Sequence, residues 1–267
     1  LVRNMAKYGA RVGVWGLEMT PEQMFVRDIS STSNTKGTDF LAAKERISPR
    51  RRKEIFQIMQ EWEQEIDRSS GELIYLADEE DNPINMAQLL AASKPYAFDV
   101  LVVDYVGLLE QTHKEQHISL GDALKVAKKW ADRNNAIVVV CAQVDKDMNV
   151  RYARQMEEHA PIAWKWKWDA DAKLHGVTEI TMSKARYVAP VSFNLKFDFG
   201  VMSVRDATSE EVEGTKKKSE GAKNRWAKKK DGKEEDEDDE WVNDNSEDLD
   251  EKPVRKRKNE KTCLLFI

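Results

Sequence analysis

Short apolar runs alternate with amphipathic helical stretches, and this alternation limits most strongly how the chain can fold. Between most of the runs, apolar residues recur at helical spacing, as in residues 50–66 and 119–135. Continuous apolar strands separated by helices favour a parallel sheet covered on both faces. We therefore predict an α/β fold whose ligands bind outside the carboxyl ends of the strands. The predicted strands cover residues 12–17, 72–77, 98–105, 136–143, 177–184 and 191–199.

The composition changes abruptly at Arg205. Residues 205–267 contain 16 Lys and Arg and 19 Asp and Glu in blocks such as KKKSEGAKNRWAKKK and EEDEDDEW, which leaves a balanced 27 and 29 for residues 1–204. Such blocks cannot bury enough apolar surface to offset chain entropy. We predict a globular domain at residues 1–204 and a charged, disordered tail at residues 205–267.

Cysteine usage and hydropathy point to the cytoplasm. Cys141 and Cys263 lie far apart and outside any metal-ligand spacing, and the four histidines show no such spacing either. No apolar run reaches the roughly 18 residues of a membrane span, and no signal-peptide pattern opens the chain. We expect a reducing, cytoplasmic location. The first residue is Leu1, in a stretch typical of the end of a helix, so we expect the sequence to begin inside a domain.

Glu18 follows the first apolar run directly. Thr20, Pro21 and Gln23 form a capping-box pattern for a helix that begins at once. Glu18 is therefore placed in the turn between strand and helix, at the ligand end of the sheet. There it could act as a base that activates a water molecule. An exposed acid near a helix N-terminus is also common, and the stretch alone leaves both interpretations open.

Asp104 ends the most apolar of the predicted strands, in FDVLVVDY. A strand of this kind ending in Asp is typical of the Walker B pattern, whose carboxylate holds the Mg²⁺ of a bound nucleotide through water. The alternative is a polar strand terminus without a ligand.

Gln143 ends another predicted strand, and Lys184 and Arg186 follow a later one. The glutamine could report the state of a nucleotide by hydrogen bonding a γ-phosphate. The two cations, at spacing two on an extended segment, point the same way and could clamp a phosphate. Each could otherwise be an ordinary solvated strand end.

Taken in order, these elements resemble the RecA-like ATPase domain of DnaB-type replicative DNA helicases, over about residues 1–200. The matching stretches are Gly16-Leu17-Glu18-Met19, Val102-Val103-Asp104-Tyr105, Ala142-Gln143, Asp169-Ala170-Asp171-Ala172 and Lys184-Ala185-Arg186. The resemblance implies a P-loop NTPase core with a mostly parallel central sheet. It also implies a homo-hexamer that hydrolyses ATP with Mg²⁺ and moves on single-stranded DNA.

The resemblance also assigns roles. Glu18 would polarise the attacking water, Asp104 would hold Mg²⁺, and Gln143 would couple the nucleotide to a DNA loop. Lys184 and Arg186 would reach the nucleotide of the next subunit. A helicase of this type suggests a phage-encoded protein in a bacterial cytoplasm.

Several family features are absent or displaced. No G-x-x-x-x-G-K-[ST] occurs, and Lys36-Gly37-Thr38 lacks the preceding glycine. The family's phosphate-binding loop would lie just before LVRNMAKYGA, so we expect it to be lost with the N-terminus of the sequence. The sheet would then lack a core strand, and this piece alone would bind ATP poorly. The family's arginine after the glutamine is displaced to Arg151 and Arg154, and the glycine after K-x-R is missing.

Residues 149–172 correspond to the region that supplies DNA-channel loops in RecA-like motors. Tryptophans alternate there with lysines, a combination that offers base stacking and phosphate contacts. Aromatic residues at period two are also typical of a strand packed on a core, with the lysines simply solvated. The candidate DNA contacts are Arg151, Arg154, Lys165, Trp166 and Lys167.

The tail and the missing loop leave alternatives open. Acidic runs with an apolar end could dock a primase, a polymerase or a single-strand-binding protein, or could only keep the chain solvated. Besides a helicase motor, the sequence is compatible with a RecA-like recombinase or recombination mediator. It is also compatible with a non-catalytic accessory protein that retained the fold.

Overall fold

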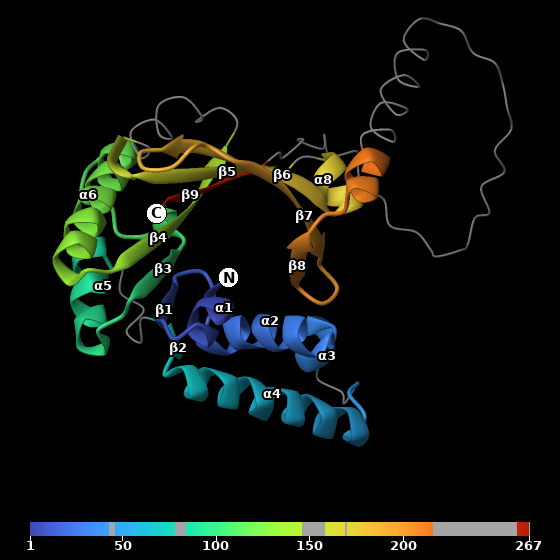
Figure 1. Cartoon of the computed structure of the whole chain (residues 1–267). Helices are drawn as coiled ribbons and strands as arrows, with labels where there is room; N and C mark the ends of the chain where they lie inside the picture. Colours follow the sequence, from blue (N-terminus) through green and yellow to red (C-terminus); the bar gives the residue numbers. More distant parts are fainter. Residues whose placement is uncertain (43–45, 78–83, 146–157, 169, 216–260, 267) are drawn as a thin grey trace, which may run out of the picture.

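The computed structural model describes residues 1–42, 46–77, 84–145, 158–168, 170–215 and 261–266. Its strands form one nine-stranded sheet in the order β2-β1-β3-β4-β9-β5-β6-β7-β8 (Figure 1). None of the helices in these ranges is long and apolar enough to cross a membrane.

One half of the sheet is parallel. β1 (Arg11–Gly16) lies between β2 (Glu72–Leu76) and β3 (Val100–Asp104), and β4 (Ile137–Asp145) pairs with the other side of β3. The connections are helical, as the apolar spacing predicts. They are α1 (Val2–Lys7), α2 (Pro21–Ser33), α3 (Gly37–Phe40), α4 (Pro49–Ser69), α5 (Met86–Ser93), η1 (Lys94–Tyr96), η2 (Val106–Leu108) and α6 (Gln116–Asn134).

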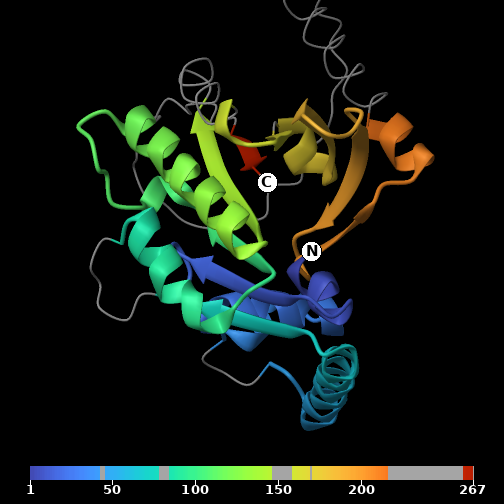
Figure 2. The ribbon, with the colours of Figure 1, turned by 60° about the vertical axis from the view of Figure 1, so that its left-hand side comes forward.

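Helices cover both faces of this half, which confirms the prediction. On one face, Leu89, Leu101 and Leu124 belong to an apolar cluster formed with α5 and α6. On the other face, Ala6, Val102 and Ile66 belong to a cluster formed with α1, α2 and α4. Figure 2 shows the two helical layers on either side of the strands. The alternate residues of each strand therefore point into two separate cores.

The other half of the sheet is antiparallel. It contains β5 (Ile162–Trp168), β6 (Val177–Ala185), β7 (Ser192–Asp198) and β8 (Ser203–Asp206), with α8 (Ala170–His175) between β5 and β6. The sequence predicts β6 and β7 as strands but leaves only a short connection between them. Parallel strands need a long crossover, so a short turn produces a hairpin instead.

Residues 162–168, for which the resemblance implies a DNA-channel loop, form β5. The Trp164 ring packs edge-on against Phe193, with 5.3 Å between ring centroids. This arrangement follows the alternative interpretation of the period-two pattern, a strand packed through its aromatic face. The side chains of Trp166 and Lys167 lie outside the described part of the chain.

Ordered elements continue past the predicted boundary at residue 204. β8 runs through Asp206, and residues 209–215 are helical. β9 (Lys261–Phe266) lies between β4 and β5 and runs antiparallel to both. The rest of the predicted tail is outside the described residues. The sheet that we expected to lack a core strand is therefore continuous through a strand from the C-terminal end, which joins its two halves.

Candidate active site

The turn that carries Glu18 is fixed by the start of α2. β1 ends at Gly16, and the capping box closes two residues after Glu18. The Gln23 backbone N–H donates to Thr20 Oγ1 at 3.3 Å, and the Thr20 N–H donates to Gln23 Oε1 at 3.1 Å. The predicted capping box is confirmed. Glu18 is left exposed in a bend of three residues between a buried strand and a capped helix.

Gly16 allows α2 to approach β1 closely. A Cβ atom at Gly16 would lie 2.6 Å from the Met24 Cε atom and 2.6 Å from the Met19 carbonyl oxygen. Real Cβ atoms do not approach other atoms so closely, so a larger residue would push the turn away from the strand. The glycine therefore helps to set the position of Glu18.

Asp104 lies beside this turn. It is the last residue of β3 and pairs in register with Gly16, and the Leu17 N–H donates to its carbonyl oxygen at 2.8 Å. Val102 and Val103 before it are buried. Glu18 and Asp104 therefore lie at the carboxyl ends of two adjacent parallel strands.

The Asp104 carboxyl group sits in an electrostatically divided environment. Burial raises its pKa above the ordinary value of 3.8, and the negative charge of Glu18 acts in the same direction. The Arg27 guanidinium on α2 opposes them and lowers the pKa. The sequence pattern did not single out Arg27. The available signal was its spacing of three from Met24, which places it on the helix face that meets β1.

The two carboxylates are a suitable donor set for Mg²⁺. This ion keeps several waters and binds through one or two carboxylates together with substrate phosphates. The chain would therefore need to supply no more than Asp104 and Glu18. Among the described residues, no group of three or more His, Cys, Asp and Glu side chains gathers at a potential metal site.

Gln143 lies at the same edge of the sheet. Val103 pairs with Val140, so Gln143 lies three residues further along β4, beyond the level of Asp104. Its backbone pairs with Cys263 of β9. The orientation of its side chain is outside the described part of the structure.

Lys184 and Arg186 lie elsewhere. Lys184 shares one row of the sheet with Val103, through paired residues on β4, β9 and β5. Four strand spacings of about 4.8 Å separate them by roughly 19 Å. Arg186 is further toward the opposite edge, where its Nη2 donates to the Glu158 carbonyl oxygen at 3.0 Å. Within one chain, these two cations do not meet Glu18 and Asp104.

The candidate DNA contacts are only partly described. Lys165 is half-buried on β5, and the alternation of the strand places it on the opposite face from Trp164. Arg151 and Arg154 lie outside the described residues.

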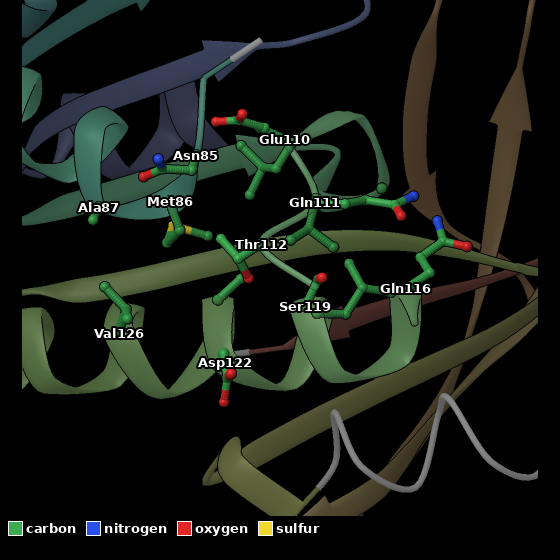
Figure 3. A pocket seen from close by; sticks show the side chains of 15 residues that line it. Asn85, Met86, Ala87, Glu110, Gln111, Thr112, Gln116, Ser119, Asp122 and Val126 are labelled. Carbon is green, nitrogen blue, oxygen red and sulfur yellow. The ribbon is translucent and has the colours of Figure 1, made fainter. Parts of the chain in front are cut away.

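A small hollow lies next to the site, after β3 and η2 (Figure 3). It has an apolar floor that includes Met86 and Leu120, and Gln111 and Gln116 are among its polar residues. At about 80 Å³ it is much smaller than the pockets of about 300–1,000 Å³ that hold small-molecule ligands. We therefore do not assign a nucleotide to it.

A family model decides the classification. The model of the DnaB-like helicase C-terminal domain matches residues 1–161. This chain belongs to that family. The matched part of the DnaB-like domain includes Glu18, Asp104 and Gln143 and ends before Lys184. A comparison with the curated proteins gives no match.

Solved structures confirm the RecA-like helicase fold. One of them, an ATPase domain solved by itself, is 14% identical with a TM-score of 0.63, and the match covers 78% of each chain. A DnaB-like replicative helicase, solved in a study of its interactions with primase, is 15% identical with the same TM-score. That match covers 78% of this chain and 53% of the other, so this DnaB-like domain spans about half of that helicase.

Proposed function

We propose that this chain is the motor part of an ATP-dependent replicative DNA helicase, which uses ATP hydrolysis to move along single-stranded DNA and to unwind duplex. One observation carries the proposal: Glu18 and Asp104 lie at the carboxyl ends of adjacent parallel strands. Ligands of such sheets bind at this edge. Membership in the DnaB-like family supports the same reaction.

In this proposal the two carboxylates act differently. Glu18 is exposed in its bend, where it accepts a hydrogen bond from the attacking water and takes its proton. Asp104 is fixed at the end of a buried strand and holds the Mg²⁺ of the nucleotide. The bound ion would neutralise charge that develops on the phosphate oxygens. The backbone cradle for those phosphates would come from a loop ahead of Leu1.

The remaining charges come from a neighbour. Because Lys184 and Arg186 are separated from Asp104 by four strand spacings, we propose that they serve the nucleotide of the next subunit in a homo-hexamer. A cation supplied from another subunit stabilises the negative charge of phosphoryl transfer. The site is then complete only when two chains meet.

Coupling to DNA follows from the position of Gln143. We propose that it links the nucleotide to the segment containing Arg151 and Arg154, and that Lys165, Trp166 and Lys167 contact single-stranded DNA. Primase, polymerase or a single-strand-binding protein would engage the tail. We also propose a phage origin and work in a bacterial cytoplasm.

Glu18→Gln tests the proposed reaction in a polypeptide that carries a phosphate-binding loop ahead of Leu1. We expect ATP hydrolysis to fall by at least about 100-fold because a positioned base is removed. ATP binding should remain, since the amide has the same shape. Glu22→Gln, four residues later in the first turn of α2, is the matched control and should keep its turnover. Retained turnover in Glu18→Gln would refute the assignment.

A further inference from the structure

A second charged surface lies far from β5, where α2, α3 and the N-terminal end of α4 come together (Figure 1). A hollow of about 380 Å³ opens there. Its floor is apolar and partly aromatic, with Phe40, Ile55 and Met59 from α3 and α4. Phe56 also lines it, and 58% of this residue is exposed. Large aromatic side chains are seldom left this open without a partner.

Cations surround this floor. Arg46 and Arg52 line the same hollow, and both are exposed. Arg52 is held in place because its Nε donates to the Ile47 carbonyl oxygen at 3.1 Å. Asp39 is the acidic residue of the lining. The hollow therefore combines an aromatic floor with two guanidinium groups at its edge.

The sequence of α4 adds more positive charge at this point. The helix begins with Arg50, Arg51, Arg52 and Lys53, and its first turn contains no acid. Cations at a helix N-terminus are unfavourable because that end already carries partial positive charge. A helix selected only for stability would place acids there. The excess of charge therefore indicates an anionic partner.

The fold neutralises this charge only in part. Arg51 turns inward, where it donates to the Ser33 carbonyl oxygen and to Thr35 Oγ1, and so it anchors α4 to α2. Arg50 and Arg51 share one acid, Glu54. The side chain of Arg50 remains 92% exposed. One carboxylate for two arginines leaves a net positive surface around the hollow.

We propose that this hollow, named here the α3–α4 hollow, binds single-stranded nucleic acid, with a base on Phe56 and the backbone phosphates on Arg46, Arg52 and Lys53. Aromatic faces and arginines together are the chemistry that holds unpaired bases without sequence preference. This contact lies apart from Lys165 and requires no nucleotide hydrolysis, so it is independent of the proposed motor activity.

The test measures binding of a fluorescent oligothymidylate to the full chain by anisotropy over a series of salt concentrations. Phe56→Ala should weaken binding by roughly 5- to 10-fold, because the base no longer stacks on an aromatic ring. Arg46→Gln combined with Lys53→Gln should lower the salt dependence by about 1.4 in slope, since each phosphate contact on a single strand contributes about 0.7. The same variants in a Lys165→Ala, Lys167→Ala background separate this contact from the one proposed on β5.

Matched controls remove the same groups elsewhere. Phe199→Ala deletes another aromatic residue that is about half exposed, and Arg68→Gln removes a cation from the last turn of α4. Both should bind the oligonucleotide like the unmodified chain, and circular dichroism confirms that all variants fold. Equal losses in controls and hollow variants, or no loss in the hollow variants, would overturn the proposal.

An acidic peptide is the competing occupant. A synthetic peptide of residues 231–241 reproduces the acidic run of the tail. If this peptide binds the unmodified chain and not Arg46→Gln, while oligonucleotide binding stays unchanged, the hollow serves a peptide and the nucleic-acid proposal is wrong.

Discussion

Asp104 is placed where chemistry needs it and where stability does not. Its carboxyl group ends a buried strand, beside the like charge of Glu18, and its pKa is raised as a result. Among the described residues, no side chain or backbone N–H donates a hydrogen bond to its carboxyl oxygens. A carboxylate in this position is destabilising unless a cation joins it, which is typical of functional sites.

Asp104→Asn should therefore stabilise the fold at neutral pH. Because the folded state raises the pKa above 3.8, the folded chain binds this proton more tightly than the unfolded chain, and stability falls as pH rises through the folded pKa. Neutral asparagine removes this loss. Thermal unfolding should show a higher Tm for the variant at pH 7. The gain should disappear in acid, where Asp104 is protonated in both states.

Asp122 provides the opposite sign as a control. Its pKa is lowered, chiefly by a hydrogen bond from Lys125, so its negative charge is favourable in the folded chain. Asp122→Asn should lower the Tm slightly at pH 7. An Asp104→Asn variant with an unchanged or lower Tm at pH 7 would contradict the description of Asp104.

At the scale of elements, the start of α2 connects stability with the site. Thr20→Ala removes the side-chain acceptor for the Gln23 N–H. We expect a loss of about 1 kcal/mol in the free energy of unfolding, or roughly 2–4 °C in Tm. Thr32→Ala is the control on the same helix, since its hydroxyl only donates back to the Asp28 carbonyl oxygen and such bonds add little. Equal effects of the two substitutions would show that the cap does not hold the turn.

β5 gives the second prediction at this scale. Lys165→Ala combined with Lys167→Ala, in a chain that carries the phosphate-binding loop, should weaken single-stranded DNA binding. The salt dependence should become shallower by about 0.7 for each phosphate contact that the substitutions remove. Lys128→Ala removes a cation that pairs with Asp132 on α6 and serves as the control. An unchanged salt slope would refute DNA contact at β5.

Local signals in the sequence determine the parallel half of the sheet well. The capping box at Thr20, the helices at residues 50–66 and 119–135, and the strand ends at Glu18 and Asp104 are all correctly predicted. Each of these depends on residues close together in the sequence. Because parallel strands that share helical crossovers end at one edge, the proximity of Glu18 to Asp104 follows from them as well.

Pairing between distant segments was not predictable in this way. Nothing in the sequence around Cys263 indicates that β9 pairs with Gln143, because strand partners are chosen by the whole fold. The predicted boundary at residue 204 cuts through β8 because a change in composition was taken as the end of structure. Arg27 was missed because its proximity to Asp104 depends on how α2 packs against β1.

For the whole molecule, the main result is that the proposed catalytic groups are divided. Glu18 and Asp104 lie at one end of the parallel strands, and Lys184 and Arg186 lie about four strand spacings away, in the antiparallel half. A sheet is rigid, so no small motion of one chain joins these groups. An oligomer whose subunits meet head to tail brings them together at every interface.

Subunit mixing tests this claim most directly, in chains that carry the phosphate-binding loop. Glu18→Gln chains and Arg186→Ala chains should each be inactive alone, because every interface lacks one group. When equal amounts are mixed and reassembled, about one interface in four pairs an intact Glu18 with an intact Arg186. We predict that the mixture recovers a corresponding share of ATP hydrolysis. A mixture as inactive as either variant alone would contradict a site shared between subunits.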